Sequence, residues 1–96
     1  MVLEIADFLV RDGDEDRFAA AYRDAVSFIT DSPGCLGARL VRGVENPRRF
    51  VLLVEWERLE DHIEGFRGSP AFQQWRGAVG GYFAQPPTVE HATDVR

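Results

Sequence analysis

The stretch FVLLVEWERLEDHIEGF, residues Phe50 to Phe66, decides the fold because it carries the chain from a strand directly into a helix. It opens with five apolar residues in a row, so both faces of the strand are apolar, as in a strand that is covered on two sides. The spacing of one inward helical face follows, at Leu59, His62, Ile63 and Phe66. The stretch therefore predicts a two-sided strand over residues 50–57 and an amphipathic helical segment behind it.

Three further segments have the pattern of strands. Residues 2–10 alternate with apolar side chains on both sides, and residues 35–42 follow the turn-forming sequence Ser32-Pro33-Gly34. Residues 88–95 alternate again at the end of the chain. Together with residues 50–57, these segments predict a sheet of four strands.

Two helices lie between these strands. The first begins with acidic residues at positions 14–16, which suit the positive end of a helix dipole, and ends before Ser32. Its inward stripe is Phe18, Tyr22, Ala25 and Ile29. The second follows the helical segment before Gly68, with Ser69 as the N-cap and Pro70 in the first turn. Its apolar stripe is Phe72, Trp75, Val79 and Phe83.

The order strand, helix, strand, strand, helix, strand predicts a ferredoxin-like α+β domain over residues 1–96, with an antiparallel sheet and both helices on one face. The other face would be bare and apolar, which a monomer rarely tolerates. This face would present Leu3, Ile5, Leu9, Val51 and Leu53. We therefore expect a homodimer in which the open sheet faces pack together.

Composition excludes several classes of protein. The net charge of -5 disfavours nucleic-acid binding, which needs a clustered positive surface. The longest apolar run has five residues, far too few to span a bilayer. Cys35 is the only cysteine, and no positive charge precedes the apolar residues of the N-terminus as in a secretion signal. The expected protein is soluble and cytoplasmic.

Five short segments in this order resemble one known family. They are PGCLG at 33–37, VLLVEW at 51–56, the helix start with His62, GSPAFQQW at 68–75 and PPTVEH at 86–91. The combination resembles the antibiotic biosynthesis monooxygenase family of small dimeric α+β barrels. The resemblance implies a pocket between sheet and helices, and the oxidation of quinols or aromatic polyketides by molecular oxygen without metal or flavin. It also implies a homodimer.

His62 is the candidate catalytic residue for that chemistry. Cofactor-free oxygenation requires a dry aromatic pocket and a group that removes a proton from the substrate. A histidine beside apolar side chains is desolvated and stays neutral near pH 7, as a general base should. The alternative is that His62 only satisfies a backbone carbonyl inside the core.

The expected walls of the pocket are aromatic. A planar substrate would stack on Trp56, and further contacts are predicted for Phe66, Phe72, Trp75 and Tyr22. His91 is a second proton carrier, whose side of the sheet the sequence leaves open. Each aromatic side chain also has an ordinary explanation as core. Metal-ligand motifs are absent, so we expect neither a metal site nor a cofactor.

A non-catalytic dimer that binds a small aromatic ligand or haem is the alternative function. The haem-degrading branch of the family needs an asparagine in the first strand, and residues 2–10 contain none. Its haem-ligating histidine would also stand later than His62, near Phe66. Haem degradation is therefore disfavoured, and a binding module remains the competing hypothesis.

Overall fold

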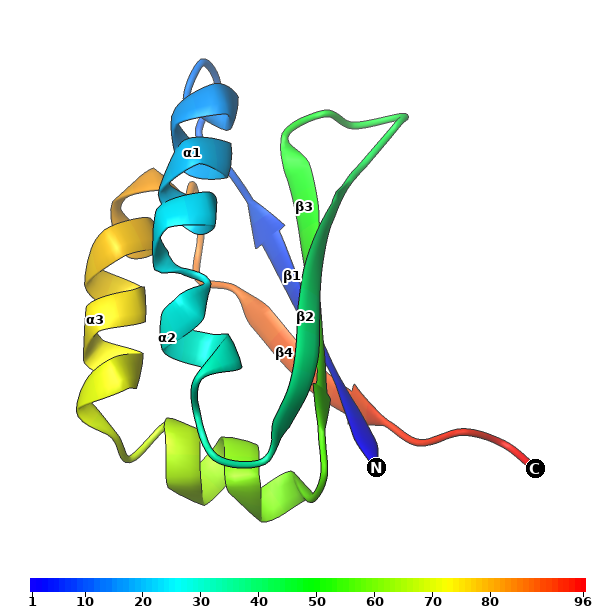
Figure 1. Ribbon diagram of the computed structural model, residues 1–96. Helices are drawn as coiled ribbons and strands as arrows, with labels where there is room; N and C mark the ends of the chain where they lie inside the picture. The colour runs from blue at the N-terminus through cyan, green and yellow to red at the C-terminus, as the bar shows by residue number, and fades with distance from the viewer.

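The computed structural model describes all 96 residues, and its strands form one antiparallel sheet with every helix on the same face (Figure 1). Its strands are β1 (Val2–Leu9), β2 (Cys35–Arg42), β3 (Arg49–Trp56) and β4 (Thr88–Ala92), in the spatial order β2-β3-β1-β4. The first crossover carries α1 (Glu15–Ala25) and α2 (Ser27–Thr30), and the second carries the π-helix η1 (Asp61–Phe66), α3 (Pro70–Val79) and the short 3-10 turn η2 (Gly80–Tyr82). The ferredoxin-like α+β fold is confirmed.

The core lies between the helices and one face of the two central strands. β1 and β3 pair antiparallel along their whole length, so residues of like parity on the two strands share a face. The helix-facing parity carries the buried core side chains of the sheet, at Ala6, Phe8, Phe50, Leu52, Val54 and Trp56. α1 adds Phe18, which is fully buried with its ring centroid 4.9 Å from that of Phe50.

The open face of the sheet has the predicted apolar parity. Leu3, Ile5 and Leu9 on β1 and Val51 and Leu53 on β3 are only partly buried there. The same face carries Asp7 and Arg49, joined by a guanidinium-to-carboxylate ion pair with a shortest contact of 2.6 Å. Half-exposed apolar side chains therefore surround one charged pair on this face.

Two predicted boundaries were wrong. The first helix breaks at Val26, because the Ile29 N–H reaches back only three residues to the Val26 carbonyl, 3.0 Å away, and tightens the turn. The last strand ends at Ala92 instead of Val95, and Val95 is fully exposed. A strand needs a partner for its backbone, and the pairing of β4 with β1 stops at Ala92, which is opposite Leu3.

Phe83 does not belong to the second helix as its spacing suggested. α3 ends at Val79, and η2 follows it, so Phe83 lies in an extended segment that bridges to Val10. Its ring stacks on Phe8 with centroids 4.7 Å apart. The consecutive glycines Gly80-Gly81 weaken the helix at this point.

The helical segment after β3 is a π-helix, which the apolar spacing did not reveal. The Arg67 N–H donates to the His62 carbonyl five residues back at 3.0 Å, the hydrogen bond that defines this wider turn. His62 and Phe66 remain on one side of this wider turn, and both are buried. Ile63, predicted to face inward, is 39% exposed.

The Asp61 carboxylate connects the start of η1 with the turn that precedes β2. Asp61 accepts a hydrogen bond from the Arg58 N–H at 3.1 Å, which supplies the N-terminal partner that a Ser or Thr cap would usually provide. The same side chain packs against Gly34, whose φ of 86° already disfavours any residue with a Cβ. Only glycine fits at position 34 for both reasons.

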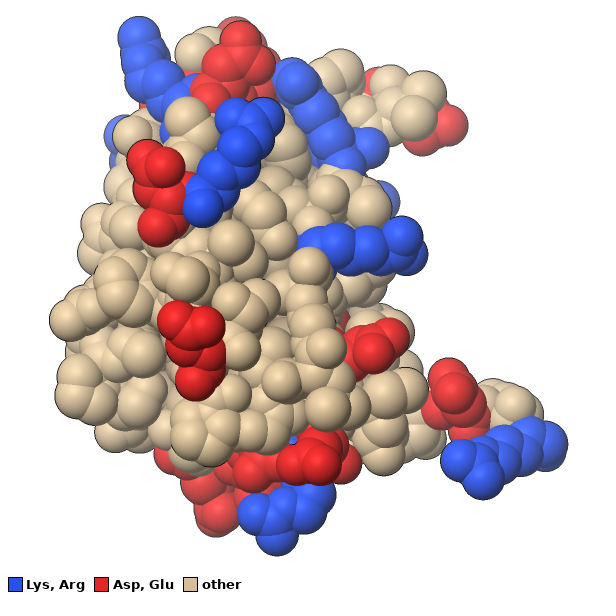
Figure 2. Space-filling view, viewed as in Figure 1, with Lys and Arg blue, Asp and Glu red and all other residues tan.

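None of the helices has the length and apolar character needed to cross a bilayer. On the face drawn in Figure 2, acidic and basic side chains are interspersed and gather toward the two ends of the molecule. The face shown thus presents no clustered positive surface of the kind that nucleic-acid binding requires.

We predict that Phe18→Ala lowers the free energy of unfolding by about 3–5 kcal/mol, because truncating a fully buried phenylalanine leaves a cavity among the surrounding rings. Urea denaturation followed by tryptophan fluorescence measures the change. Val44→Ala is the matched control, since Val44 is 87% exposed, and it should change stability by less than about 0.5 kcal/mol. Equal effects of the two substitutions would contradict the described core.

Candidate functional site

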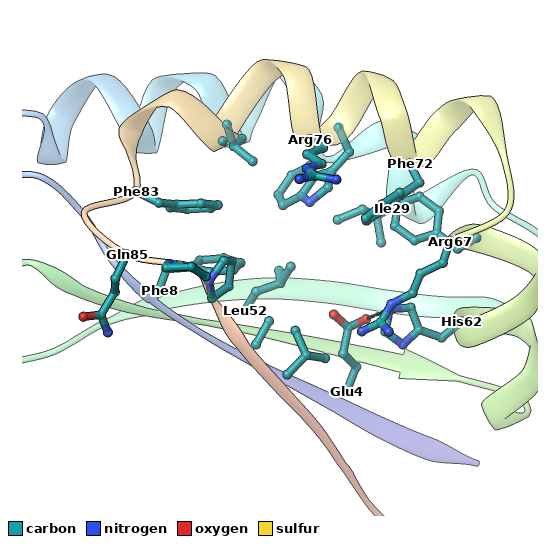
Figure 3. A pocket seen from close by; sticks show the side chains of 18 of the residues that line it. Glu4, Phe8, Ile29, Leu52, His62, Arg67, Phe72, Arg76, Phe83 and Gln85 are labelled. Atoms are coloured by element: carbon teal, nitrogen blue, oxygen red, sulfur yellow. Dashed lines mark ion pairs between the residues drawn. The ribbon is translucent and has the colours of Figure 1, made fainter.

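A cavity of about 630 Å³ lies between the sheet and the helices (Figure 3). Its floor comes from β1 and β3, its roof from α2 and α3, and its far side from the segment of residues 83–87. Most of its lining is apolar, with a few charged and polar groups. This size and mixture are typical of pockets for small molecules.

Glu4 is the buried acid at one end of this cavity. It has the helix-facing parity of Ala6 and Phe8 on β1, and it is only 6% exposed. Its Oε1 accepts a hydrogen bond from the fully buried Trp56 indole Nε1 at 3.0 Å. In Figure 3 the second carboxylate oxygen of Glu4 faces the cavity. A carboxyl group therefore stands at one end of the apolar pocket.

His62 lies beside Glu4 and is 2% exposed. The π-helix η1 brings it there, with its Nε2 3.3 Å from Glu4 Oε1. Its ring stacks on Trp56 at a centroid distance of 5.3 Å and an interplanar angle of 17°. Burial, together with the positive charges of Arg67 and His91, lowers the pKa of His62 to about 4. At neutral pH the pair is a neutral imidazole next to a carboxyl group, not an ion pair.

His91 extends this contact on the other side of the His62 ring. β4 pairs with β1 so that His91 is opposite Glu4, and both point toward the helix layer. His91 Nε2 and His62 Nδ1 are 2.8 Å apart, a hydrogen bond in which one ring N–H donates to the other ring's lone pair. The question that the sequence left open is answered, because His91 lies on the pocket side of the sheet and not on the open face.

The pKa shifts at this end of the cavity have one dominant cause. Burial raises the pKa of Glu4, and its effect outweighs both the Trp56 hydrogen bond and the positive charge of Arg67, which act in the opposite direction. Burial lowers the pKa of His91, and Arg67 adds to that effect. The site thus favours the uncharged forms of all three titratable groups.

The other end of the cavity is aromatic and aliphatic. Phe8 and Phe83 stack there, and Figure 3 shows them at the end opposite Glu4 and His62. Phe66 and Phe72 meet edge to face with centroids 5.5 Å apart beside the histidine. The arrangement can hold a flat apolar body with one polar edge directed at Glu4.

The structure brings four of the seven predicted site residues into the cavity wall, namely His62, Phe66, Phe72 and Trp75. The other three lie next to it. Trp56 stands behind His62, Tyr22 meets Trp75 edge to face at 6.1 Å, and His91 touches His62 from outside the wall. Their substrate contacts stay predictions.

Sequence analysis missed Glu4, Arg67 and Phe8. Glu4 was detectable as the one charged residue among helix-facing positions of a strand that is otherwise apolar on that side. Arg67 lines the cavity without a carboxylate within ion-pair distance, in a chain that has more acidic than basic residues. Phe8 appeared as a strand residue, and no local pattern shows that a cavity lies above it.

The sequence profile of the family described as antibiotic biosynthesis monooxygenase matches residues 1–78. The chain belongs to this family. The match covers β1 through most of α3, and so includes Glu4, His62 and the aromatic side chains around them. The resemblance first suggested by short motifs is therefore confirmed over most of the chain.

Two relatives share much of the sequence, and one of them has a solved structure. YczJ, an uncharacterized protein of Bacillus subtilis (strain 168), is 41% identical over 99% of this chain and 100% of its own length. A crystal structure of a candidate antibiotic biosynthesis monooxygenase from Bordetella bronchiseptica is also 41% identical, with a TM-score of 0.96 over 99% of this chain and 97% of that one.

SnoaB of Streptomyces nogalater, named as a cofactor-independent oxygenase, shares the fold at 20% identity, with a TM-score of 0.76 over 99% of this chain and 92% of its own.

We predict an acid-dependent loss of stability from His62. Its pKa of about 4 in the folded protein lies below the ordinary value of 6.5, so the unfolded chain binds this proton first as the pH falls. The contribution is complete above about pH 6.5 and disappears toward pH 4, a loss of about 3 kcal/mol. Urea denaturation at pH 7 and pH 4 measures it.

His62→Gln is the control for this prediction, because glutamine does not titrate. The raised pKa of Glu4 acts in the opposite direction, since protonation of Glu4 favours the folded state. The comparison between the two proteins removes most other titrating groups. An equal loss of stability in both proteins between pH 7 and pH 4 would show that burial does not hold His62 neutral.

Proposed function

We propose that the protein is a cofactor-independent monooxygenase that oxidises a polycyclic phenol or quinol with molecular oxygen. The observation that carries the proposal is the apolar cavity of about 630 Å³ with the Glu4 carboxyl group and the neutral His62 ring at one end. The aromatic side chains leave enough room for a ring system between them. A cavity closed by its own aromatic side chains would have favoured a structural role.

Glu4 is the proposed base, with His62 as its partner. A buried carboxylate whose pKa is raised is a stronger base than one in water, and removes a proton from a phenol or an activated carbon more readily. Trp56 holds one oxygen of Glu4, so the other remains for the substrate. Arg67, close enough to shift the pKa of Glu4, stabilises the substrate anion that results.

The overall reaction balances without a cofactor for an anthrone, whose central carbon is a methylene. That carbon loses a proton to Glu4, and the anion passes electrons to oxygen and forms a carbon-oxygen bond as a peroxide. The proton that Glu4 received, or one equal to it, then goes to the peroxide. The same carbon loses its second hydrogen as a proton while the O–O bond breaks, and this proton and the departing hydroxide form water. The methylene becomes a carbonyl, one oxygen atom stays in the product and the other leaves as water.

We also propose that two copies associate through the open sheet face. The half-exposed side chains of Leu3, Ile5 and Leu53 form an apolar surface of the kind that a partner normally covers. A second copy would present the same surface, as a twofold interface requires. Asp7 and Arg49 would then lie inside or at the edge of the contact.

Oxygen uptake with quinols and anthrones tests the activity. The enzyme, stripped of metal and free of haem, should consume one oxygen molecule per anthrone converted to anthraquinone. Catalase should leave this ratio unchanged, because no hydrogen peroxide is released. Absence of uptake across the panel, with saturable binding of the same compounds, would favour the competing non-catalytic binding module.

We predict that Glu4→Gln and His62→Gln each lower kcat, because removal of a general base or of its partner costs about 10²–10⁴-fold. Glu4→Gln should cost more, since the carboxyl group faces the cavity. Gln73→Ala, on the exposed side of α3, is the control and should retain full activity. Circular dichroism confirms folding, and unchanged kcat in folded Glu4→Gln would eliminate Glu4 as the base.

We predict that Leu53→Glu converts the dimer to a monomer, because each interface would then bury two carboxylates without partners. Light scattering coupled to size exclusion measures the mass. Val44→Glu, on the hairpin between β2 and β3, adds the same charge at an exposed position and should remain dimeric. A wild-type protein that is monomeric at all concentrations would refute the interface.

A further inference from the structure

Three titratable side chains form one continuous line that begins at the cavity and ends on the edge strand of the sheet. Glu4 comes from β1, His62 from η1 and His91 from β4. The line runs from Glu4 Oε1 to His62 Nε2 at 3.3 Å, and from His62 Nδ1 to His91 Nε2 at 2.8 Å. Three elements that are distant in sequence therefore place three proton-carrying groups in contact.

Exposure increases toward one end of this line. Glu4 and His62 are buried, whereas His91 is only partly buried and lies on β4, which has no strand on its outer side. Glu4 and His62 line the cavity, and His91 does not. The line thus joins the interior of the cavity to a position outside its wall.

With an aromatic ligand in the cavity, the only polar path from His62 to solvent would run through His91. Trp56 covers one face of the His62 ring, and Phe66 stands 6.3 Å from it in a nearly parallel orientation. Once a ring system fills the cavity, Glu4 also loses its contact with water there. The hydrogen bond to His91 is then the polar contact that remains.

We propose that His91 exchanges protons between the buried Glu4–His62 pair and solvent while the cavity is occupied. The proposal deepens the proposed function and rests on it, because it assigns His91 a place in the proton traffic of that site. His91 does not touch the substrate; it acts through His62.

Each passage along the line balances. When Glu4 carries its proton on Oε1, that proton moves to His62 Nε2, the proton on His62 Nδ1 moves to His91 Nε2, and His91 releases the proton on its own Nδ1 to water. Each ring gains one proton and loses one, so no ring keeps a charge. The passage leaves both rings in the opposite tautomer, which is the arrangement needed to carry the next proton inward.

The charges around these three groups disfavour a proton that stays on His62 or His91. Arg67 lowers the pKa of both histidines, so a proton does not rest on either ring near neutral pH. From β2, Cys35 faces the same region, where burial raises the pKa of its thiol and the charge of Glu4 adds to the shift. Neutral Cys35 and the Trp56 indole therefore leave Glu4, His62, His91 and Arg67 as the groups that determine the proton's position.

The activity test uses His91→Ala with the best substrate from the oxygen-uptake panel. We expect kcat to fall by about tenfold or more, because proton exchange becomes slower. KM should be nearly unchanged, because substrate affinity does not depend on His91. Added imidazole should restore kcat in His91→Ala and not in His62→Gln, since the His91 side chain is only partly buried whereas that of His62 is 2% exposed. Thr93→Ala, two residues further along the chain, should behave as the wild type in both conditions.

Failure of imidazole to restore the kcat of folded His91→Ala would overturn the proposal.

If the wild type oxidises no compound in the panel, the proposed function fails, and a measurement without substrate still decides the relay. In nitrogen NMR of labelled histidine, we expect a scalar coupling between His62 Nδ1 and His91 Nε2, and a shared pH-dependent step that Glu4→Gln removes. Independent titration of the two rings, unaffected by Glu4→Gln, would refute the relay.

Discussion

The burial of Glu4 is the constraint on which the site depends. A carboxyl group on the helix-facing side of a central strand costs several kcal/mol of desolvation unless partners are supplied. Trp56 is fully buried two positions along the neighbouring strand, and its indole N–H needs an acceptor. Each side chain satisfies the other, so β1 and β3 are joined by a polar contact beneath the cavity. Burial of Glu4 depends on the Trp56 donor, and burial of the Trp56 indole depends on the Glu4 acceptor.

The π-helix η1 after β3 brings His62 to this contact. His62 contacts Glu4 while Phe66 lies beside both His62 and Trp56, and the wider turn of η1 keeps His62 and Phe66 on the buried side. An α-helix with the spacing expected from the sequence would have directed Ile63 inward as well. In the π-helix, Ile63 is exposed, and His62 is buried in contact with Glu4 and His91.

Much of the fold could be predicted because its signals are local. The period-two alternation of residues 2–10 and 50–57, the Ser69-Pro70 helix start and the acidic start of the first helix each depend on a few neighbouring residues. The boundaries that were wrong depend on partners. The last strand ends where its pairing with β1 stops, at Ala92 opposite Leu3, and Phe83 leaves the helix to stack on Phe8.

By itself, the sequence determined the order of the elements, the two apolar faces of the sheet and the presence of one histidine in an inward helical position. Only the tertiary structure decided that Glu4, His62 and His91 meet, because their contacts join β1, η1 and β4 across more than 25 residues at each step. Periodicity indicates which side of an element a residue faces. The distance between two side chains on different elements follows from strand register and helix packing, which no local pattern encodes.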